Sequence, residues 1–134
     1  MQHPVDLTKS LEQLEQSVWP HDPFPTRVVQ ESQRLRKVPL YRLTTEDLRL
    51  LIGQKIGLPF LVPLALDQLE SNLFAEGAMY KGDLLVNVLT VPKEFWESQP
   101  ALGNRLVDLN SQAKQVLELL SSELLPAFER LLCQ

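Results

Sequence analysis

The sequence contains few of the side chains that bind metals or act as general bases. One cysteine, Cys133, and two histidines, His3 and His21, occur in 134 residues. A single cysteine excludes an internal disulfide and is typical of a reducing compartment. No Cys-x-x-Cys or His-Glu-x-x-His spacing is present. We therefore expect no metal, no cofactor and a cytoplasmic location.

Long apolar runs, glycine-rich motifs and excess positive charge are also missing. The longest apolar run, residues 58–66, contains two prolines and is too short to cross a bilayer, and no secretory signal pattern precedes it. The five glycines do not form a phosphate-binding motif after a strand. The net charge is -4, which argues against nucleic acid or an anionic membrane as the direct partner and slightly favours a basic one. Ordinary solubility is the favoured explanation of an acidic chain.

The clearest pattern that is present predicts a helix from Thr44 to Gly57. Thr44 is a good N-cap, and Asp47 stands at the capping-box position three residues later. Glycine followed by Pro59 is a typical helix stop. The apolar residues of one face are Leu48, Leu51, Ile52 and Ile56.

The rest of the chain shows the same period and no convincing alternation of strand type. We expect a first helix capped by Asp6 or Thr8, a stiff proline spacer over residues 20–25, and a second helix from Thr26 to about Lys37. Later helices are expected near residues 59–70, 83–90 and 100–125, with Pro63 either kinking the first of them or marking its true start. The prediction is an all-α fold of six or seven helices in a single domain, residues 1–134. Residues 1–25 form an N-terminal helix and linker, and residues 26–134 form the helical core.

The longest predicted helix carries an apolar repeat. Its members are Leu102, Leu106, Leu109, Ala113, Val116, Leu120 and Leu124. Such spacing can form a coiled-coil dimer, but about three heptads is short, so packing against the chain's own core is favoured over a homodimer through residues 102–120. Pro126 should bend or restart this helix near residues 121–123.

The chemistry of an enzyme or of a DNA reader is not visible. Glu46 and Asp47 are explained as first-turn helix acids. Residues 46–70 have the outline of a helix-turn-helix, but the second helix would present Phe60, Leu61 and Asp67 to the bases, where polar and basic side chains are needed. We expect neither an enzyme nor a nucleic-acid-binding protein.

Several segments in order resemble the immunity proteins of contact-dependent growth inhibition (CDI) systems. These are RLRKVPL at residues 34–40, LTTEDLR at 43–49, IGQKIGL at 52–58, LVPLAL at 61–66, EG at 76–77 and YKGDLL at 80–85. The resemblance covers about residues 27–97. It implies a non-catalytic protein that binds the C-terminal toxin domain of a CDI effector one to one, with a nuclease as the leading expectation. The alternative is a helical adaptor or regulatory protein that binds a housekeeping partner.

Within this resemblance most matching residues are expected to be architectural. Thr44 and Asp83 should cap helices, Gly57 should end one, and Gly53 should mark a close helix approach. The connection from Glu70 to Asp83 is the expected toxin contact. The candidate contact residues are Glu70, Glu76, Tyr80 and Asp83. The alternative for each acid is a solvated surface charge.

Overall fold

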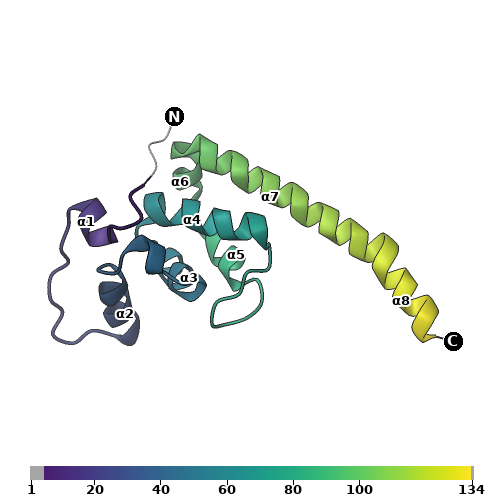
Figure 1. Cartoon of the computed structure of the whole chain (residues 1–134), viewed down its shortest axis with the longest axis horizontal. Helices are drawn as coiled ribbons and strands as arrows, with labels where there is room; N and C mark the ends of the chain where they lie inside the picture. The colour runs from purple at the N-terminus through teal and green to yellow at the C-terminus, as the bar shows by residue number, and fades with distance from the viewer. Residues whose placement is uncertain (1–4, 134) are drawn as a thin grey trace. The chain divides into compact units, whose positions relative to one another are not determined.

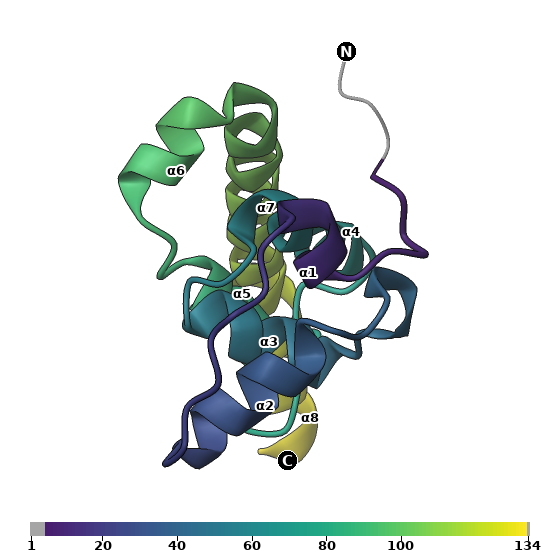
Figure 2. The ribbon, with the colours of Figure 1, turned by 90° about the vertical axis from the view of Figure 1, so that its left-hand side faces the viewer.

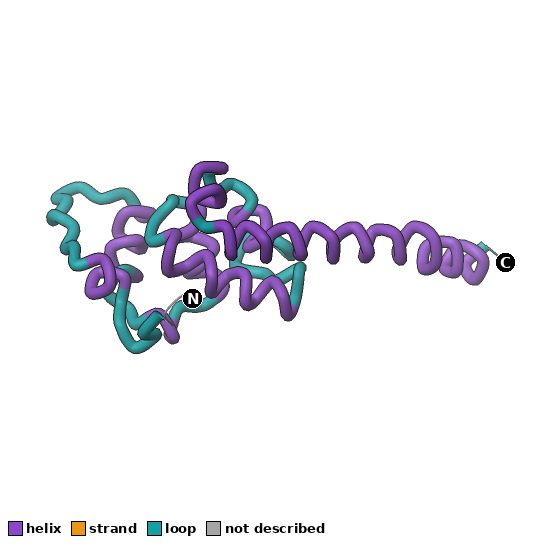
Figure 3. The backbone as a smooth tube through the Cα atoms, turned by 90° about the horizontal axis from the view of Figure 1, so that it is seen from above, coloured by secondary structure: helices purple, strands orange, loops and turns teal. Residues whose placement is uncertain are grey.

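The part of the chain that the computed structural model describes, residues 5–133, consists of helices joined by loops and contains no β-strand (Figures 1 and 3). In chain order the elements are α1 (Leu11–Glu15), α2 (Arg27–Leu35), a 3₁₀ turn η1 (Leu40–Arg42), α3 (Thr45–Gly53), α4 (Leu58–Ser71), α5 (Asp83–Val88), α6 (Lys93–Ser98), α7 (Pro100–Leu119), a π-turn η2 (Leu120–Leu124) and α8 (Leu125–Leu132). The all-α prediction is confirmed. Since α7 and α8 join through the π-turn without a break, the number of helices also agrees with the expected six or seven.

The chain divides into two compact units. The first covers residues 1–93 and holds α1 to α5, and the second covers residues 94–134 and holds most of α6 together with α7, η2 and α8. The division falls after Lys93, and the single domain expected over residues 1–134 stays a prediction.

Side-chain caps fix the starts of three helices. The predicted capping box of α3 is confirmed, because Thr44 Oγ1 accepts from the Asp47 N–H at 3.1 Å and Asp47 Oδ2 accepts from the Thr44 N–H at 2.9 Å. Thr26 caps α2 as expected. The prediction for α1 was wrong, since its cap is Ser10. Asp6 instead accepts hydrogen bonds from its neighbour Thr8, which closes a local turn before the helix begins.

The core of the first unit lies among α3, α4 and α5 (Figure 2). Leu48, Leu51 and Ile52 of α3 are buried as predicted. The core side chains of the other two helices are Leu61, Val62, Ala65, Leu66 and Leu69 of α4 with Leu84 and Val88 of α5. Pro63 lies inside α4, which begins at Leu58, so the alternative that it marks the helix start was wrong.

Gly53, in the last turn of α3, and Gly57, four residues later, each allow another part of the chain to approach closely. A Cβ on Gly53 would lie 2.8 Å from Asn87 Nδ2, so the predicted close approach is present, against α5. The Asn87 amide also donates to the Arg49 carbonyl at 2.8 Å, which ties the two helices together. The prediction that Gly57 ends α3 was wrong, because α3 stops at Gly53 with Gln54 as its C-cap, and Gly57 is instead the N-cap of α4. Gly57 has φ +63°, and a Cβ there would lie 2.7 Å from both terminal methyls of the buried Leu11.

The second unit contains one long helix with a single irregular turn. The Leu125 N–H donates to the Leu120 carbonyl, five residues earlier, which defines the π-turn. Pro126 has no N–H to donate in the following turn. Ser121 and Ser122 donate their hydroxyl hydrogens to the Leu117 and Glu118 carbonyls at 2.8 and 2.6 Å. The predicted irregularity near residues 121–123 is therefore confirmed.

Gly57→Ala should destabilise the chain more than the matched change Gly82→Ala. Both glycines have positive φ, which costs an alanine about 1–2 kcal/mol. At Gly57 the new methyl also overlaps Leu11, and overpacking a core adds about 1–3 kcal/mol, whereas nothing lies within 4 Å of a Cβ on Gly82. Urea unfolding of both variants measures the difference. Equal losses of unfolding free energy would contradict the packing role of Gly57.

Candidate functional site

Two carboxylates accept hydrogen bonds from the backbone of the loop between α4 and α5. Asp83, the first residue of α5, accepts hydrogen bonds from the N–H groups of Gly77 (2.6 Å), Met79 (2.9 Å) and Tyr80 (3.3 Å). The N–H of Ala78, which lies between them, donates to Glu46 of α3 at 2.8 Å. Four consecutive backbone donors are therefore satisfied by side chains from two helices.

Arg49 links the two carboxylates. Its Nη2 lies 2.7 Å from Glu46 Oε2, and its Nε lies 3.8 Å from Asp83 Oδ2. Gly77 completes the arrangement because a Cβ there would come within 2.6 Å of Glu46 Oε1 and 3.2 Å of the Glu46 backbone. Only glycine fits at this position while both carboxylates stay in place.

Both carboxyl groups are stabilised in the ionised form. Burial raises the pKa of Asp83, but the three backbone hydrogen bonds and the charge of Arg49 outweigh it, so the pKa lies below its ordinary value. For Glu46 the hydrogen bond from Arg49 is the largest cause, and the pKa is again lowered despite partial burial. The charges needed to hold the loop are therefore present at neutral pH.

The structure separates the four predicted contact residues into two groups. Glu76 and Tyr80 lie exposed on the loop, and Glu70 lies exposed near the end of α4. Asp83 is buried, with its carboxylate occupied by the loop. Its expected capping role was also wrong, since Gly82 is the N-cap of α5. Asp83 reaches back to an earlier loop, which local helix signals do not reveal.

The loop exposes two further apolar side chains that the sequence analysis did not select. Met79 is 66% exposed and Phe74 is 47% exposed, beside Tyr80 at 51%. Their position in a segment bounded by Gly77 and Gly82 was a usable signal for Met79 and Tyr80, because large apolar residues at a loop tip have no core to enter. Large exposed apolar side chains near one another are typical of interaction surfaces.

A groove runs beside this loop between α2 and α3. It has a volume of about 410 Å³ and is lined by Arg27, Val28, Glu31, Leu35, Glu46, Asp47, Arg49, Leu50 and Ala78. Val28, Leu35 and Leu50 give it an apolar component, while the acids and arginines give it charges of both signs. The Glu31 carboxylate is paired with Arg34 and the Glu46 carboxylate with Arg49. Such a groove can accept a protein segment with both apolar and charged side chains.

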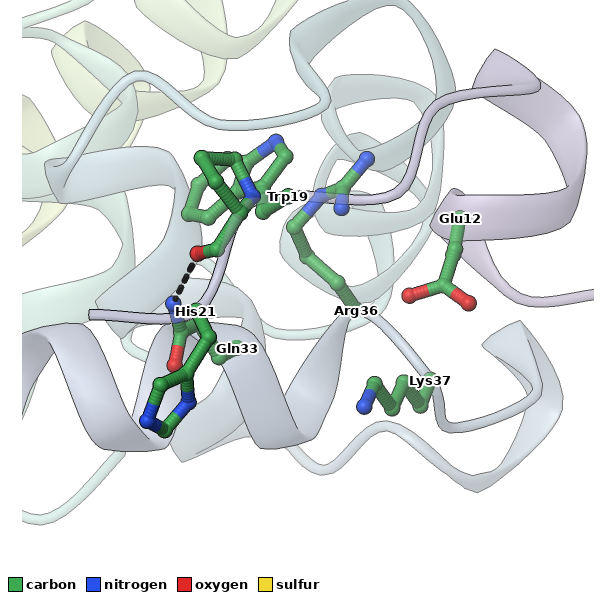
Figure 4. A pocket seen from close by; sticks show the side chains of 7 residues that line it. Glu12, Trp19, His21, Gln33, Arg36 and Lys37 are labelled. Atoms are coloured by element: carbon green, nitrogen blue, oxygen red, sulfur yellow. Dashed lines mark hydrogen bonds between the residues drawn. The ribbon is translucent and has the colours of Figure 1, made fainter. Parts of the chain in front are cut away.

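A second pocket, of about 130 Å³, surrounds Arg36 (Figure 4). Arg36 is the C-cap of α2, and its side chain is buried. Its guanidinium lies 4.4 Å from the centre of the Trp19 ring and donates to Glu15 Oε1 at 2.8 Å and to the Ser17 carbonyl at 3.0 Å. Gln33 donates to the Pro20 carbonyl. Arg36 therefore links the end of α1 and residues 17–19 to the end of α2, and Gln33 links α2 to the start of the proline spacer.

The described residues contain no cluster of side chains that could bind a metal ion. Among residues 5–133, no three His, Cys, Asp or Glu side chains are placed so that they could hold a metal ion. His21 lies in the proline spacer beside the Arg36 pocket, far in sequence from the loop carboxylates. Within the same residues, no helix is both long enough and apolar enough to cross a membrane. The arrangement of the loop and groove is suited to binding.

A family model described as CDI immunity proteins matches residues 13–106, which is most of the chain and includes the loop and the groove. No curated protein and no solved structure matches.

Asp83→Ala should destabilise the chain by more than the same change at a half-buried aspartate in a turn. Its removal leaves the partly buried Gly77, Met79 and Tyr80 N–H groups without their carboxylate acceptor, and a hydrogen bond to a charged group contributes about 1.5–3 kcal/mol. The matched control is Asp22→Ala, because Asp22 accepts a hydrogen bond from only the Phe24 N–H. Chemical denaturation measures both changes. A loss no larger than that of the control would contradict the structural role of Asp83.

The lowered pKa values predict loss of stability in acid. A carboxyl whose pKa is lower in the folded state contributes stability above its unfolded pKa, and this contribution is lost as the pH falls through the folded pKa. The ordinary values are 3.8 for Asp83 and 4.5 for Glu46, so the loss should begin near pH 4.5 and continue below 3.8. Urea midpoints between pH 7 and pH 3 measure it. Asp83→Asn should flatten this profile, and an unchanged slope would show that Asp83 is not a source.

Proposed function

The chain belongs to the family of CDI immunity proteins, and from this membership we propose that it binds the C-terminal toxin domain of a CDI effector and protects the cell that makes it. The observation that carries the proposal is the family match over residues 13–106. Inhibition by binding needs no chemistry of its own. The carboxylates of Glu46 and Asp83 are compatible with such a binding role. They accept hydrogen bonds from the backbone N–H groups of the loop, and Arg49 pairs with Glu46.

The loop between α4 and α5 and the adjacent groove form the proposed toxin-binding surface. Glu76, Met79 and Tyr80 are exposed on the loop, and Glu70 lies near its start. Asp83 is buried and positions the loop by accepting hydrogen bonds from its backbone. A loop whose backbone is already held loses less conformational freedom on binding, so more of the contact energy appears as affinity.

A basic nuclease is the toxin that the charge of this chain favours. The net charge is -4, and an acidic surface accelerates association with a basic one and competes with the phosphates of its substrate. In this proposal one chain captures one toxin domain in the cytoplasm, before the toxin reaches nucleic acid. Raising the ionic strength should then slow association more than it speeds dissociation.

Co-expression tests the function directly. The tagged chain should capture the toxin domain encoded with it at one to one stoichiometry and restore growth to cells that express that domain. A toxin domain shown to be folded and active, but neither captured nor neutralised, would overturn the proposal for that pair.

Substitutions in the loop should weaken toxin binding without unfolding the chain. Tyr80→Ala should weaken binding at least tenfold, which corresponds to about 1.4 kcal/mol, because exposed tyrosines often contribute strongly to interfaces. Glu76→Lys should weaken it further by reversing a charge that faces a basic partner. Calorimetric titration with the toxin domain measures both effects.

Matched controls separate the proposed surface from general effects of tyrosine or charge removal. Tyr41 is 60% exposed in η1, and Glu94 is exposed in α6. Tyr41→Ala and Glu94→Lys should leave the affinity unchanged. Equal losses in the loop variants and the controls would remove the loop from the proposed surface.

A further inference from the structure

The long helix of the second unit carries an apolar stripe that is exposed over its C-terminal half. After Val116, which is half-buried, the stripe consists of Leu117, Leu120, Leu124, Leu125, Phe128, Leu131 and Leu132, all exposed. Within the predicted repeat, Leu102 and Leu109 are buried as expected for packing against the chain's own core, whereas Leu120 and Leu124 are each 40% exposed. A run of seven exposed large apolar side chains on one helix is unusual for a surface.

The π-turn keeps this stripe on one side of the helix. The central positions Ala113, Val116 and Leu120 follow a heptad, with steps of three and four residues, but the next step to Leu124 is again four. In a regular α-helix this extra residue would turn the remainder of the stripe by about 100°. A π-turn holds one extra residue, and it lies at residues 120–124. The heptad then continues unbroken through Phe128 and Leu131.

We propose that this stripe pairs with the same stripe of a second copy of the chain, with the two helices antiparallel. A heptad maintained along a straight helix is the spacing that fits another long helix, and a second copy supplies one of equal length. The family match ends at residue 106, so the proposed pairing segment lies outside the part that belongs to the immunity fold.

The order of side-chain sizes selects the antiparallel arrangement and its register. When Leu120 lies opposite the partner's Leu124, Val116 meets the partner's Phe128 and Ala113 meets the partner's Leu131. In the outer layers a small side chain then faces a large one, and in the central layer two leucines face each other. The total side-chain volume is therefore similar from layer to layer. In a parallel pair, Phe128 would meet Phe128 of the partner subunit and Ala113 would meet the partner's Ala113, so crowded layers would alternate with cavities.

The residues beside the central layers agree with the same register. Leu117 comes next to the partner's Leu125, so the widest part of the stripe is covered on both copies. On the same flank Lys114 comes next to the partner's Glu129, and by symmetry this pair of opposite charges occurs twice. Both residues are exposed in the single chain. Like charges do not meet across this register at these positions.

Light scattering after gel filtration tests whether the pair forms. The full chain should have the mass of two copies, and Leu120→Glu should halve it because it places a charge at the centre of the pair. The matched control is Leu119→Glu, at an exposed leucine about 100° away from the stripe, which should remain a dimer. Far-UV circular dichroism should show equal helix content in all three. A wild-type chain that is monomeric at every concentration overturns the proposal.

Disulfide trapping tests the orientation. In a Cys133→Ser background, chains with Ala113→Cys and chains with Leu131→Cys should form a mixed disulfide when combined, and neither should crosslink alone. In the antiparallel pair, two residues at position 113 are separated by about 27 Å, far beyond the reach of a disulfide. Crosslinks between like positions would overturn the antiparallel register. The charge pair gives a second check, since Lys114→Glu should weaken the dimer and Lys114→Glu with Glu129→Lys should restore it.

The toxin domain is the other occupant that the test can reveal. If Leu120→Glu weakens capture of the toxin domain while the wild-type chain is monomeric, the stripe is a toxin contact and the second-copy proposal is wrong. If the dimer forms and Leu120→Glu captures toxin normally, the second-copy proposal is supported and the two surfaces act independently.

Discussion

Backbone N–H groups that belong to no helix must find acceptors elsewhere, and in this chain two carboxylates supply them for four consecutive residues. Asp83 and Glu46 take the donors of residues 77–80, and Arg49 compensates their charge. The loop between α4 and α5 is consequently an ordered part of the first unit. Its exposed side chains are presented by a backbone whose polar groups are already satisfied, which is the condition a binding loop needs for high affinity.

Helix α3 contacts both the loop and the core of the first unit. Its first turns provide Glu46 and Arg49 to the loop, and its second half provides Leu51 and Ile52 to the core. At its end, Gly53 lets α5 approach closely. A disturbance of α3 therefore reaches the core and the loop together, so stability and the proposed binding of toxin by this loop should not vary independently there.

Local sequence patterns such as caps and apolar spacing predicted the helices. The arrangement of the loop site depends on contacts between residues far apart in the sequence, which those patterns do not reveal. The cap at Thr44, its partner Asp47 and the apolar face of α3 follow from spacing alone, and the structure agrees. Asp83 was placed as a helix cap because an acid before an apolar run suggests one, but its carboxylate turns to a loop that closes only in the fold. The burial of Arg36 at the end of α2 likewise depends on distant residues. Trp19 and Glu15, which bury it, lie 17 and 21 residues earlier, and no local pattern links them to it.

The π-turn has a consequence for the length of the long helix. Because the turn absorbs one residue without rotating the helix beyond it, a chain that lacked one residue between 120 and 124 could form an ordinary α-helix with the same side chains facing the same way. A single-residue gap at this place in a related sequence would therefore be structurally silent. The same gap a few turns earlier would twist the whole C-terminal surface out of line, so tolerance to length change is confined to one turn.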